Sequence, residues 1–218
     1  MKTYLKQVFL ILFYTFLSLQ FLNAQPLKEG RDFITLKTAL NVPKNSIVEL
    51  FNIGCPHCAN MNRVLPNLFS VLPDTVIFMP YHTITAAPFS SQASEVLAVS
   101  LSLDQTQNLS PKDPKSHFKR VLDSYFNANF QQRKYFKDAK SFVEYGLNAL
   151  NITQATFDST LQESYTKELL KAWKEVAQYA NIQGVPSFII NGKYLILAQG
   201  LKSEEDFIYK VAYLLGLD

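Results

Sequence analysis

The sequence predicts a mixed α/β fold in which a block of helices interrupts a set of strands. Three observations lead to this prediction: a strand–helix–strand pattern over residues 46–82, helical periodicity without strand signals over residues 86–180, and hairpin signals after that. The length of 218 residues suits one large domain or one domain carrying an insertion. Hydrophobic residues make up 48% of the chain and charged residues 18%, which allows a packed core and excludes a disordered chain.

The composition also excludes several classes of protein. Only 7 glycines are present, which argues against a turn-rich all-β fold. A net charge of +3 without a run of basic residues argues against nucleic-acid binding. The 2 cysteines cannot form a scaffold of several disulfides, so the core must be stable without such crosslinks.

Residues 1–24 have the layout of a secretory signal peptide. Lys2 and Lys6 precede an apolar run over Val8–Leu22, and Leu22-Asn23-Ala24 provides a cleavage site with a small final residue. An uncleaved membrane anchor is the alternative, although the run is shorter than the ~20 residues that span a bilayer. The sequence therefore predicts an exported protein whose mature form is nearly neutral.

The first strand–helix–strand unit contains the most distinctive motif. Ser46–Asn52 is rich in β-branched and apolar residues, which predicts a buried strand. A helix should follow, with Pro56 in its first turn, and Pro66 should kink or interrupt it. Val76–Met79 begins a second strand that runs to His82. The connection is long enough for a crossover, so the two strands should be parallel.

Helical patterns fill the middle of the chain. Three helices are expected, at Ser91–Leu103, Ser116–Phe126 and Ala139–Leu150. Polar Gln105–Lys115 should be a loop, and Thr153 or Asn151 should cap a short helix. The longest pattern repeats apolar residues every three or four positions from Leu161 to Ala180, which predicts a helix with a core-facing stripe.

The C-terminal segment returns to strands. Ser187–Ile190 and Tyr194–Ala198 flank Asn191-Gly192, a strong hairpin signal. Ser203–Asp206 resembles a capping box that opens a final helix, and Gly216 should end that helix. The predicted order is therefore β-α-β, helical block, β-β-α.

The chemistry concentrates in Cys55-Pro56-His57-Cys58. Two thiols three positions apart at a helix start can close a small disulfide ring. The first thiol lies where free N–H groups and the helix dipole favour a thiolate, and His57 can add a positive charge. A stabilised thiolate favours the reduced form, so the disulfide becomes a stronger oxidant.

Three other interpretations of the cysteine pair are less favoured. A structural disulfide across two residues would constrain the chain very little. A zinc site needs four ligands, but there is no second cysteine pair, and His82 and His117 are the only other histidines. Haem attachment requires a histidine after the second cysteine, where Ala59 stands. A redox-active pair is therefore the favoured interpretation.

With this motif, the chain resembles the DsbA family of periplasmic thiol:disulfide oxidoreductases. The Cys-Pro-His-Cys motif is typical of that family. Three further segments match: Val48–Phe51, the stretch from Leu72-Pro73-Asp74 to Tyr81-His82, and Gly184-Val185-Pro186 running into Asn191-Gly192-Lys193-Tyr194. The resemblance implies a thioredoxin fold with an inserted α-helical domain. The expected parts are a signal peptide at 1–24, a thioredoxin-like domain at 25–85 and 181–218, and the inserted domain at 86–180.

The resemblance also assigns roles to the motif. Cys55 would be the exposed cysteine that forms mixed disulfides with clients, and Cys58 the buried resolving thiol. His57 would be the main side chain that stabilises the Cys55 thiolate, and Pro56 would help to tune the redox potential. DsbA itself has a strongly oxidising cysteine pair with a low thiol pKa, so the resemblance implies an effect in the same direction for Cys55 and Cys58.

Outside the motif, the resemblance points to an acid and a proline loop. Glu49 would be the family's buried acid beneath the thiols, able to accept or relay the Cys58 proton; a solvated strand residue is the alternative. Val185 and Pro186 would form the cis-proline loop that faces the disulfide and pairs with the client backbone. His82 is expected to be structural rather than catalytic, and Trp173 to belong to the core.

Two residues depart from the family pattern. Gly54 stands before the first cysteine, where a bulkier residue is frequent, so the apolar surface beside the disulfide should differ. Pro80 stands where a lysine can occur, which removes one charge partner for Glu49. The redox potential is therefore expected to differ from that of the best-known members.

The resemblance implies an exported oxidase of the periplasm that introduces disulfide bonds into reduced exported proteins. It would act as a monomer without organic cofactor or metal, and a DsbB-like, quinone-linked membrane protein would reoxidise it. Two alternatives stay open. One is a disulfide reductase or isomerase of the same fold, against which the Pro-His dipeptide and the lack of a dimerisation domain weigh. The other is a client-binding chaperone without redox turnover.

Overall fold

The structure is a computed structural model that describes residues 26–216, so the expected signal peptide lies outside the described residues. Within this range five strands form one sheet in the order β1-β5-β4-β2-β3. The strands are β1 (Phe33–Thr35), β2 (Ser46–Phe51), β3 (Ile77–His82), β4 (Ser187–Ile190) and β5 (Tyr194–Ile196). β2 and β3 are parallel, as predicted, and the other pairs are antiparallel.

The prediction that the strand at Ser46 comes first is wrong. β1 precedes it and pairs with β5 at the edge of the sheet, with Phe33 opposite Ile196 and Thr35 opposite Tyr194. Three residues are too few to show a period of two, and β1 is held by a strand that lies far away in the sequence.

Helix α2 (Pro56–Val71) joins the two parallel strands, and it continues through Pro66. The expected interruption is therefore absent. Proline removes one hydrogen-bond donor from the helix, but buried Leu65 and Leu68 hold the segment against the sheet on either side of Pro66.

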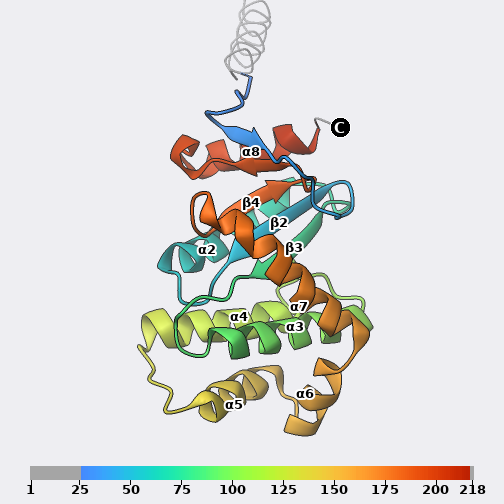
Figure 1. Cartoon of the computed structure of the whole chain (residues 1–218), viewed down its shortest axis with the longest axis vertical. Helices are drawn as coiled ribbons and strands as arrows, with labels where there is room; N and C mark the ends of the chain where they lie inside the picture. Colours follow the sequence, from blue (N-terminus) through green and yellow to red (C-terminus); the bar gives the residue numbers. More distant parts are fainter. Residues whose placement is uncertain (1–25, 217–218) are drawn as a thin grey trace, which may run out of the picture.

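The helical block lies between β3 and β4 in the sequence and forms the lower half of the molecule in Figure 1. Its helices are α3 (Ser90–Thr106), α4 (His117–Phe126), α5 (Ala139–Leu150), α6 (Gln154–Leu161) and α7 (Ser164–Val176). The single helix expected from Leu161 to Ala180 is instead divided, because α6 ends at Leu161, α7 ends at Val176 and a 3-10 turn follows. The N-cap of α6 is Thr153, one of the two candidate caps predicted for a short helix.

A π-helical segment in the helical block was not predicted. Residues Asn127–Gln131 form a π-helical segment, η1, directly after α4. π-helical turns are rare and often occur at functional sites. This one lies next to the loop that carries the cysteines, as shown below.

The predicted C-terminal hairpin turn and final helix are confirmed, but β5 ends at Ile196 rather than at Ala198, because a 3-10 turn begins there. Asn191 and Gly192 both have positive φ angles, 53° and 65°, as a tight hairpin turn requires. α8 (Glu204–Leu215) begins after Ser203, whose hydroxyl accepts the Asp206 N–H at 3.2 Å, and Gly216 ends it. No helix within residues 26–216 is long and apolar enough to cross a bilayer.

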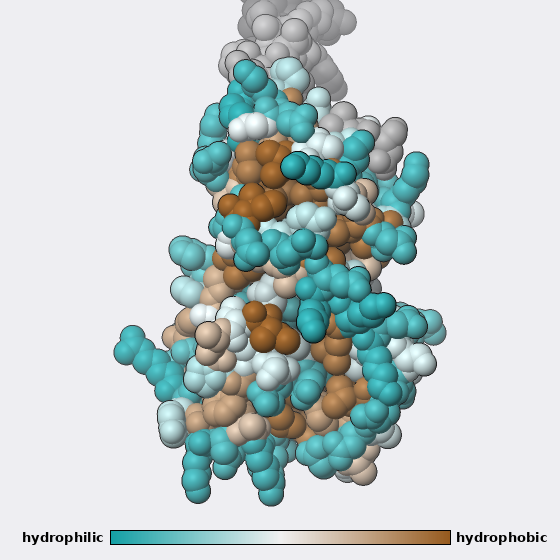
Figure 2. All heavy atoms as spheres, in the orientation of Figure 1, coloured by the Kyte–Doolittle hydropathy of each residue, from teal (hydrophilic) through white to brown (hydrophobic). Residues whose placement is uncertain are grey.

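The sheet separates two apolar cores. Val48 and Leu50 of β2 face the helical block, whereas Ile47 faces the side covered by α2 and α8. β4 alternates in the same way, with Ile189 on the first side and Ile190 on the second. Hydrophilic residues cover much of the face drawn in Figure 2, with hydrophobic patches over both halves of the molecule. This is the thioredoxin fold with an inserted helical domain.

Candidate functional site

The two cysteines lie at the start of α2, where the parallel strand β2 ends. Both are free thiols. Cys55 is the N-cap residue, and its sulfur accepts the backbone N–H of Cys58 at 3.3 Å. Pro56 occupies the first helical turn, as predicted, and the His57 side chain is exposed beside it. The helix start thus directs a free N–H group at the Cys55 sulfur, which favours negative charge there.

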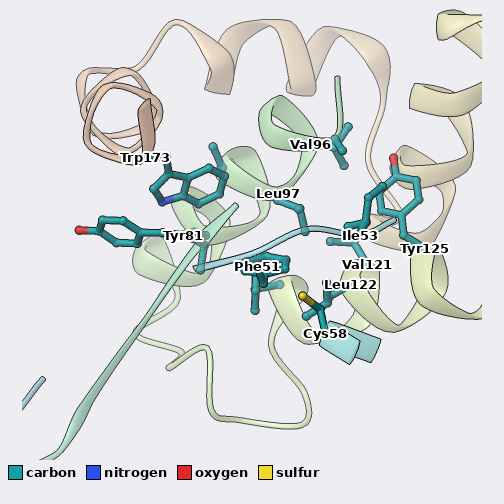
Figure 3. Packing of buried hydrophobic residues seen from close by; sticks show 14 of the residues in the cluster. Phe51, Ile53, Cys58, Tyr81, Val96, Leu97, Val121, Leu122, Tyr125 and Trp173 are labelled. Carbon is teal, nitrogen blue, oxygen red and sulfur yellow. The ribbon is translucent and has the colours of Figure 1, made fainter. Parts of the chain in front are cut away.

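The environments of the two thiols are opposite. Cys55 is partly exposed, whereas Cys58 is only 1% exposed and belongs to the core that faces the helical block. Figure 3 shows the Cys58 sulfur near Phe51 and Leu122. Burial, the hydrogen bond with Cys55 and the nearby Glu49 carboxyl together raise the pKa of Cys58 far above its usual range. One thiol is therefore accessible to a protein client, and the other is a buried thiol that strongly retains its proton.

Glu49 is buried beneath this pair. It is 4% exposed in the centre of β2, between Pro80 of β3 and Phe188 of β4. Burial raises its pKa to about 8, so the carboxyl is mostly protonated at neutral pH.

A small cavity of about 20 Å³ adjoins this carboxyl, and Asn62, Pro66, Lys112 and Lys119 also line it. Its volume is sufficient for one water molecule. Lys112 donates to the backbone oxygens of Val76 at 2.7 Å and Asp74 at 3.3 Å. The cavity thus combines a protonated carboxyl with two basic side chains of the helical block.

The loop before Cys55 is held in place by side chains from three elements. The Asn52 side chain accepts the Gly54 N–H at 2.7 Å and donates to the Thr83 carbonyl at 2.6 Å. Asn129 of η1 donates to the Ile53 carbonyl at 2.9 Å. The helical block therefore supports the cysteine loop directly.

His82 provides the third support. Its Nε2 accepts the Ile53 N–H at 3.3 Å, so its proton must lie on Nδ1, which donates to Ser94 Oγ at 2.7 Å. Burial lowers the pKa of His82 to about 3, which keeps the ring neutral. Trp173, 2% exposed, packs 6.4 Å from this ring and is part of the core, as predicted. The contacts of His82 are those of a structural residue.

The loop before β4 completes the site. The Val185–Pro186 peptide bond is cis, as the resemblance implied. The Cys55 thiol donates to the Val185 carbonyl at 3.3 Å. The structure thus brings Val185 next to Cys55, and it places Glu49 near Cys58 on the buried side. The supporting residues Asn52 and Asn129 were not predicted, because their contacts depend on the tertiary fold.

The known proteins that this chain resembles include thiol:disulfide interchange proteins. A family model described as Thioredoxin matches residues 43–209. The thiol:disulfide interchange protein DsbL of Escherichia coli O6:H1 is 32% identical over 185 residues, which cover 83% of each chain. DsbA of Salmonella typhimurium is 25% identical, covering 88% of this chain and 86% of DsbA. The crystal structure of DsbL from Salmonella enterica serovar Typhimurium superposes with a TM-score of 0.80 at 30% identity, covering 89% of this chain and 100% of DsbL.

Proposed function

Because this chain belongs to the DsbA family of thioredoxin-fold thiol:disulfide oxidoreductases, we propose that it is an oxidase that introduces disulfide bonds into exported proteins. The observation that supports this direction of electron flow is the asymmetry of the two thiols. The accessible Cys55 sulfur accepts an N–H at a helix start, whereas Cys58 is buried. Stabilisation of a Cys55 thiolate favours the reduced form of the enzyme and makes its disulfide oxidising.

The reaction proceeds by two thiolate displacements. A client thiolate attacks Cys55 Sγ of the oxidised enzyme; an S–S bond to the client forms, the Cys55–Cys58 bond breaks, and Cys58 leaves with the electron pair. Its sulfur takes the proton of Glu49. The second client thiolate then attacks the client sulfur of the mixed disulfide, releasing Cys55 as a thiolate. The client loses two electrons, and the enzyme gains them as a dithiol.

In this proposal each residue has a separate role. Cys55 is the exchanging sulfur, Cys58 the resolving thiol, and Glu49 a proton donor and acceptor for Cys58. His57 and Pro56 tune the redox potential at the helix start. Val185 and Pro186 present the edge against which the client backbone lies, since the Val185 carbonyl already contacts the Cys55 thiol.

The setting of the enzyme is also part of the proposal. Residues 1–24 direct export to the periplasm, residues 86–180 form the inserted domain, and the rest of 25–218 forms the thioredoxin-like domain. The protein acts as a monomer, and a DsbB-like, quinone-linked membrane protein restores its disulfide.

The direction of electron flow between client and enzyme is tested by measuring the equilibrium of the Cys55/Cys58 pair in glutathione buffers. In a buffer of intermediate potential, the cysteine pair of an oxidase is mostly a dithiol, whereas the cysteine pair of a reductase is mostly a disulfide.

The reduced protein is expected to be more stable than the oxidised protein. The thiolate is stabilised only when the disulfide is open, and each 30 mV of extra oxidising power corresponds to ~1.4 kcal/mol in favour of the reduced form. Urea unfolding of both forms, followed by far-UV circular dichroism, measures the difference. An oxidised form with the higher urea midpoint would contradict the assignment as an oxidase.

The His57→Ala variant is expected to be a weaker oxidant than the wild-type protein. Loss of a side chain that can donate a hydrogen bond or carry positive charge beside the helix start should shift the glutathione equilibrium toward the enzyme disulfide by about 3- to 10-fold, as an interaction of ~1 kcal/mol implies. His57→Lys should retain most of the effect, and Asn60→Ala, an exposed position of the same helix, serves as the control. Equal equilibrium constants with glutathione for His57→Ala and Asn60→Ala would show that His57 has no influence on the redox potential of the cysteine pair.

A further inference from the structure

The loop that leads into β4 carries Val185, whose carbonyl oxygen accepts the Cys55 thiol at 3.3 Å. This Val185 loop, residues Gln183–Ser187, contains Gly184 with a φ of 83°, so its backbone is neither helical nor extended at that point. Contacts from other parts of the fold must therefore hold the loop in its conformation. The proposed reaction uses the backbone of this loop but assigns no role to its polar side chains.

Gln183 anchors the start of the Val185 loop to the end of β5. Its Oε1 atom accepts the Ala198 N–H at 2.9 Å, and its Nε2 atom donates to the Ile196 carbonyl at 2.8 Å. A second hydrogen bond from Nε2 reaches Ser187 Oγ at 3.1 Å. Because the Ala198 N–H can only donate and the Ile196 carbonyl can only accept, these partners fix the orientation of the amide.

Ser187 connects this anchor to the residue before Val185. Its hydroxyl accepts from Gln183 and donates its own hydrogen to the Gly184 carbonyl at 2.7 Å. On the other side, the Gly184 N–H donates to the Ala180 carbonyl at 2.7 Å. A chain of hydrogen bonds therefore leads from the end of β5 through Gln183 and Ser187 to the peptide group that joins Gly184 to Val185.

The segment that receives Gln183 is itself firmly held. The Leu197 N–H donates to the Asp32 carbonyl at 2.9 Å. A 3-10 turn begins at Ala198, and the buried Lys210 side chain of α8 donates to the Gly200 carbonyl at its end. Gln183 thus ties the Val185 loop to the sheet and α8 rather than to another loop.

We propose that Gln183 is a positioning residue for exchange with protein clients, and that it acts through Ser187 to hold the Val185 backbone beside the Cys55 sulfur. This inference rests on the proposed function, and it names a residue that favours protein clients over small thiols. A client lies with its backbone against the Val185 loop, so a loose loop must be ordered each time a client binds. A small thiol reaches the Cys55 sulfur without backbone contacts and does not depend on that order.

Loss of the Gln183 anchor should therefore slow exchange with a peptide about tenfold, the change that an ordering cost of ~1.4 kcal/mol produces. The test measures two second-order rate constants of the oxidised protein. One is for a neutral peptide with two cysteines, and the other is for dithiothreitol, a small dithiol without a peptide backbone. Acid quenching and mass spectrometry follow the loss of the enzyme disulfide in both reactions.

Three variants separate the contacts. Gln183→Met keeps the length of the side chain but loses its three hydrogen bonds, and Ser187→Ala removes only the connection to the Gly184 carbonyl. Gln178→Met makes the first change at an exposed position of the 3-10 segment Ala177–Asn181, just before the loop, and is the matched control. Urea unfolding of each variant records any loss of stability separately from the rates.

We expect the ratio of the peptide rate to the dithiothreitol rate to fall about tenfold in Gln183→Met and about threefold in Ser187→Ala. In Gln178→Met it should stay within about twofold of the wild-type ratio. The double variant Gln183→Met, Ser187→Ala should resemble Gln183→Met, because both changes interrupt one chain of contacts.

An unchanged ratio in Gln183→Met, whatever its urea midpoint, would overturn the inference, because Gln183 would then contribute only to stability. An equal loss of both rates would also overturn it, because the loop would then act on the enzyme disulfide and not on the client. Both of these outcomes leave the proposed function intact. A wild-type disulfide that neither dithiol reduces would contradict the proposed function itself.

Discussion

The Lys210→Met variant is expected to unfold about 3 kcal/mol more easily than the wild-type protein, the magnitude typical of removing one partner from a buried ion pair. Lys210 of α8 is 1% exposed. Its Nζ atom lies 2.7 Å from the Asp206 carboxylate and 3.2 Å from that of Asp32, and it also donates to the Gly200 carbonyl. Methionine fills a similar volume but leaves the buried Asp32 without this cation.

Thermal and urea unfolding measure this effect. Lys202→Met, at an exposed position just before α8, is the control and should change stability by less than about 0.5 kcal/mol. The Lys210→Met, Asp32→Asn double variant should recover part of the loss, because the unpaired carboxylate is removed. If Lys210→Met is as stable as Lys202→Met, the ion cluster does not contribute to stability.

The pH dependence provides a second measurement of the same cluster. Burial opposes ionisation of Asp32, but hydrogen bonds from Arg31, the Lys28 N–H and Lys210 outweigh it and lower its pKa from 3.8 to about 2. A lowered pKa of an acid stabilises the fold above the unfolded value, and this contribution disappears as the pH falls from about 4 through 2. Without Lys210 the Asp32 pKa should rise, so the variant should lose this contribution at a higher pH than the wild type.

The sequence predicts the cysteine site well because its signals are local. A strand, a Cys-Pro-His-Cys motif and a helix follow one another directly, and the chain direction alone places the first thiol at the helix start. The hairpin at Asn191-Gly192 and the caps at Thr153 and Ser203 are equally local, because each depends on a few adjacent residues. These features are confirmed at the positions predicted.

The features that the sequence did not predict depend on contacts across the fold. Strand β1 is only three residues long and is held by pairing with β5. The π-helical segment has no periodic signature, and the role of Asn129 depends on its position opposite Ile53. Lys210 looks like an ordinary surface lysine of an amphipathic helix until Asp32 is brought beside it. In each case the determining partner is distant in the sequence.

The Cys58→Ser variant is expected to accumulate mixed disulfides between Cys55 and its clients. Cys58 lies at the same helix start as Cys55, so in the wild type its thiol can attack a stalled mixed disulfide from within the protein. An oriented internal thiol acts at a very high effective concentration, and its removal should lengthen the lifetime of the adduct by about 100-fold or more. In the measurement, Cys55 is first converted to a mixed disulfide with a coloured thiol. A client thiolate then displaces the coloured thiol, and the lifetime of the resulting client adduct is followed.

Two further variants separate exchange from passive client binding. Cys55→Ser should form no adduct in the same assay. Pro186→Thr adds a backbone N–H in the loop where the Val185 carbonyl contacts Cys55, so it should disturb client release and also accumulate adducts. Non-reducing gels of exported proteins from cells that produce each variant show the adducts as bands that a reductant removes. Because every such band requires the Cys55 sulfur, client binding that persists without any of them would identify a chaperone rather than an oxidase.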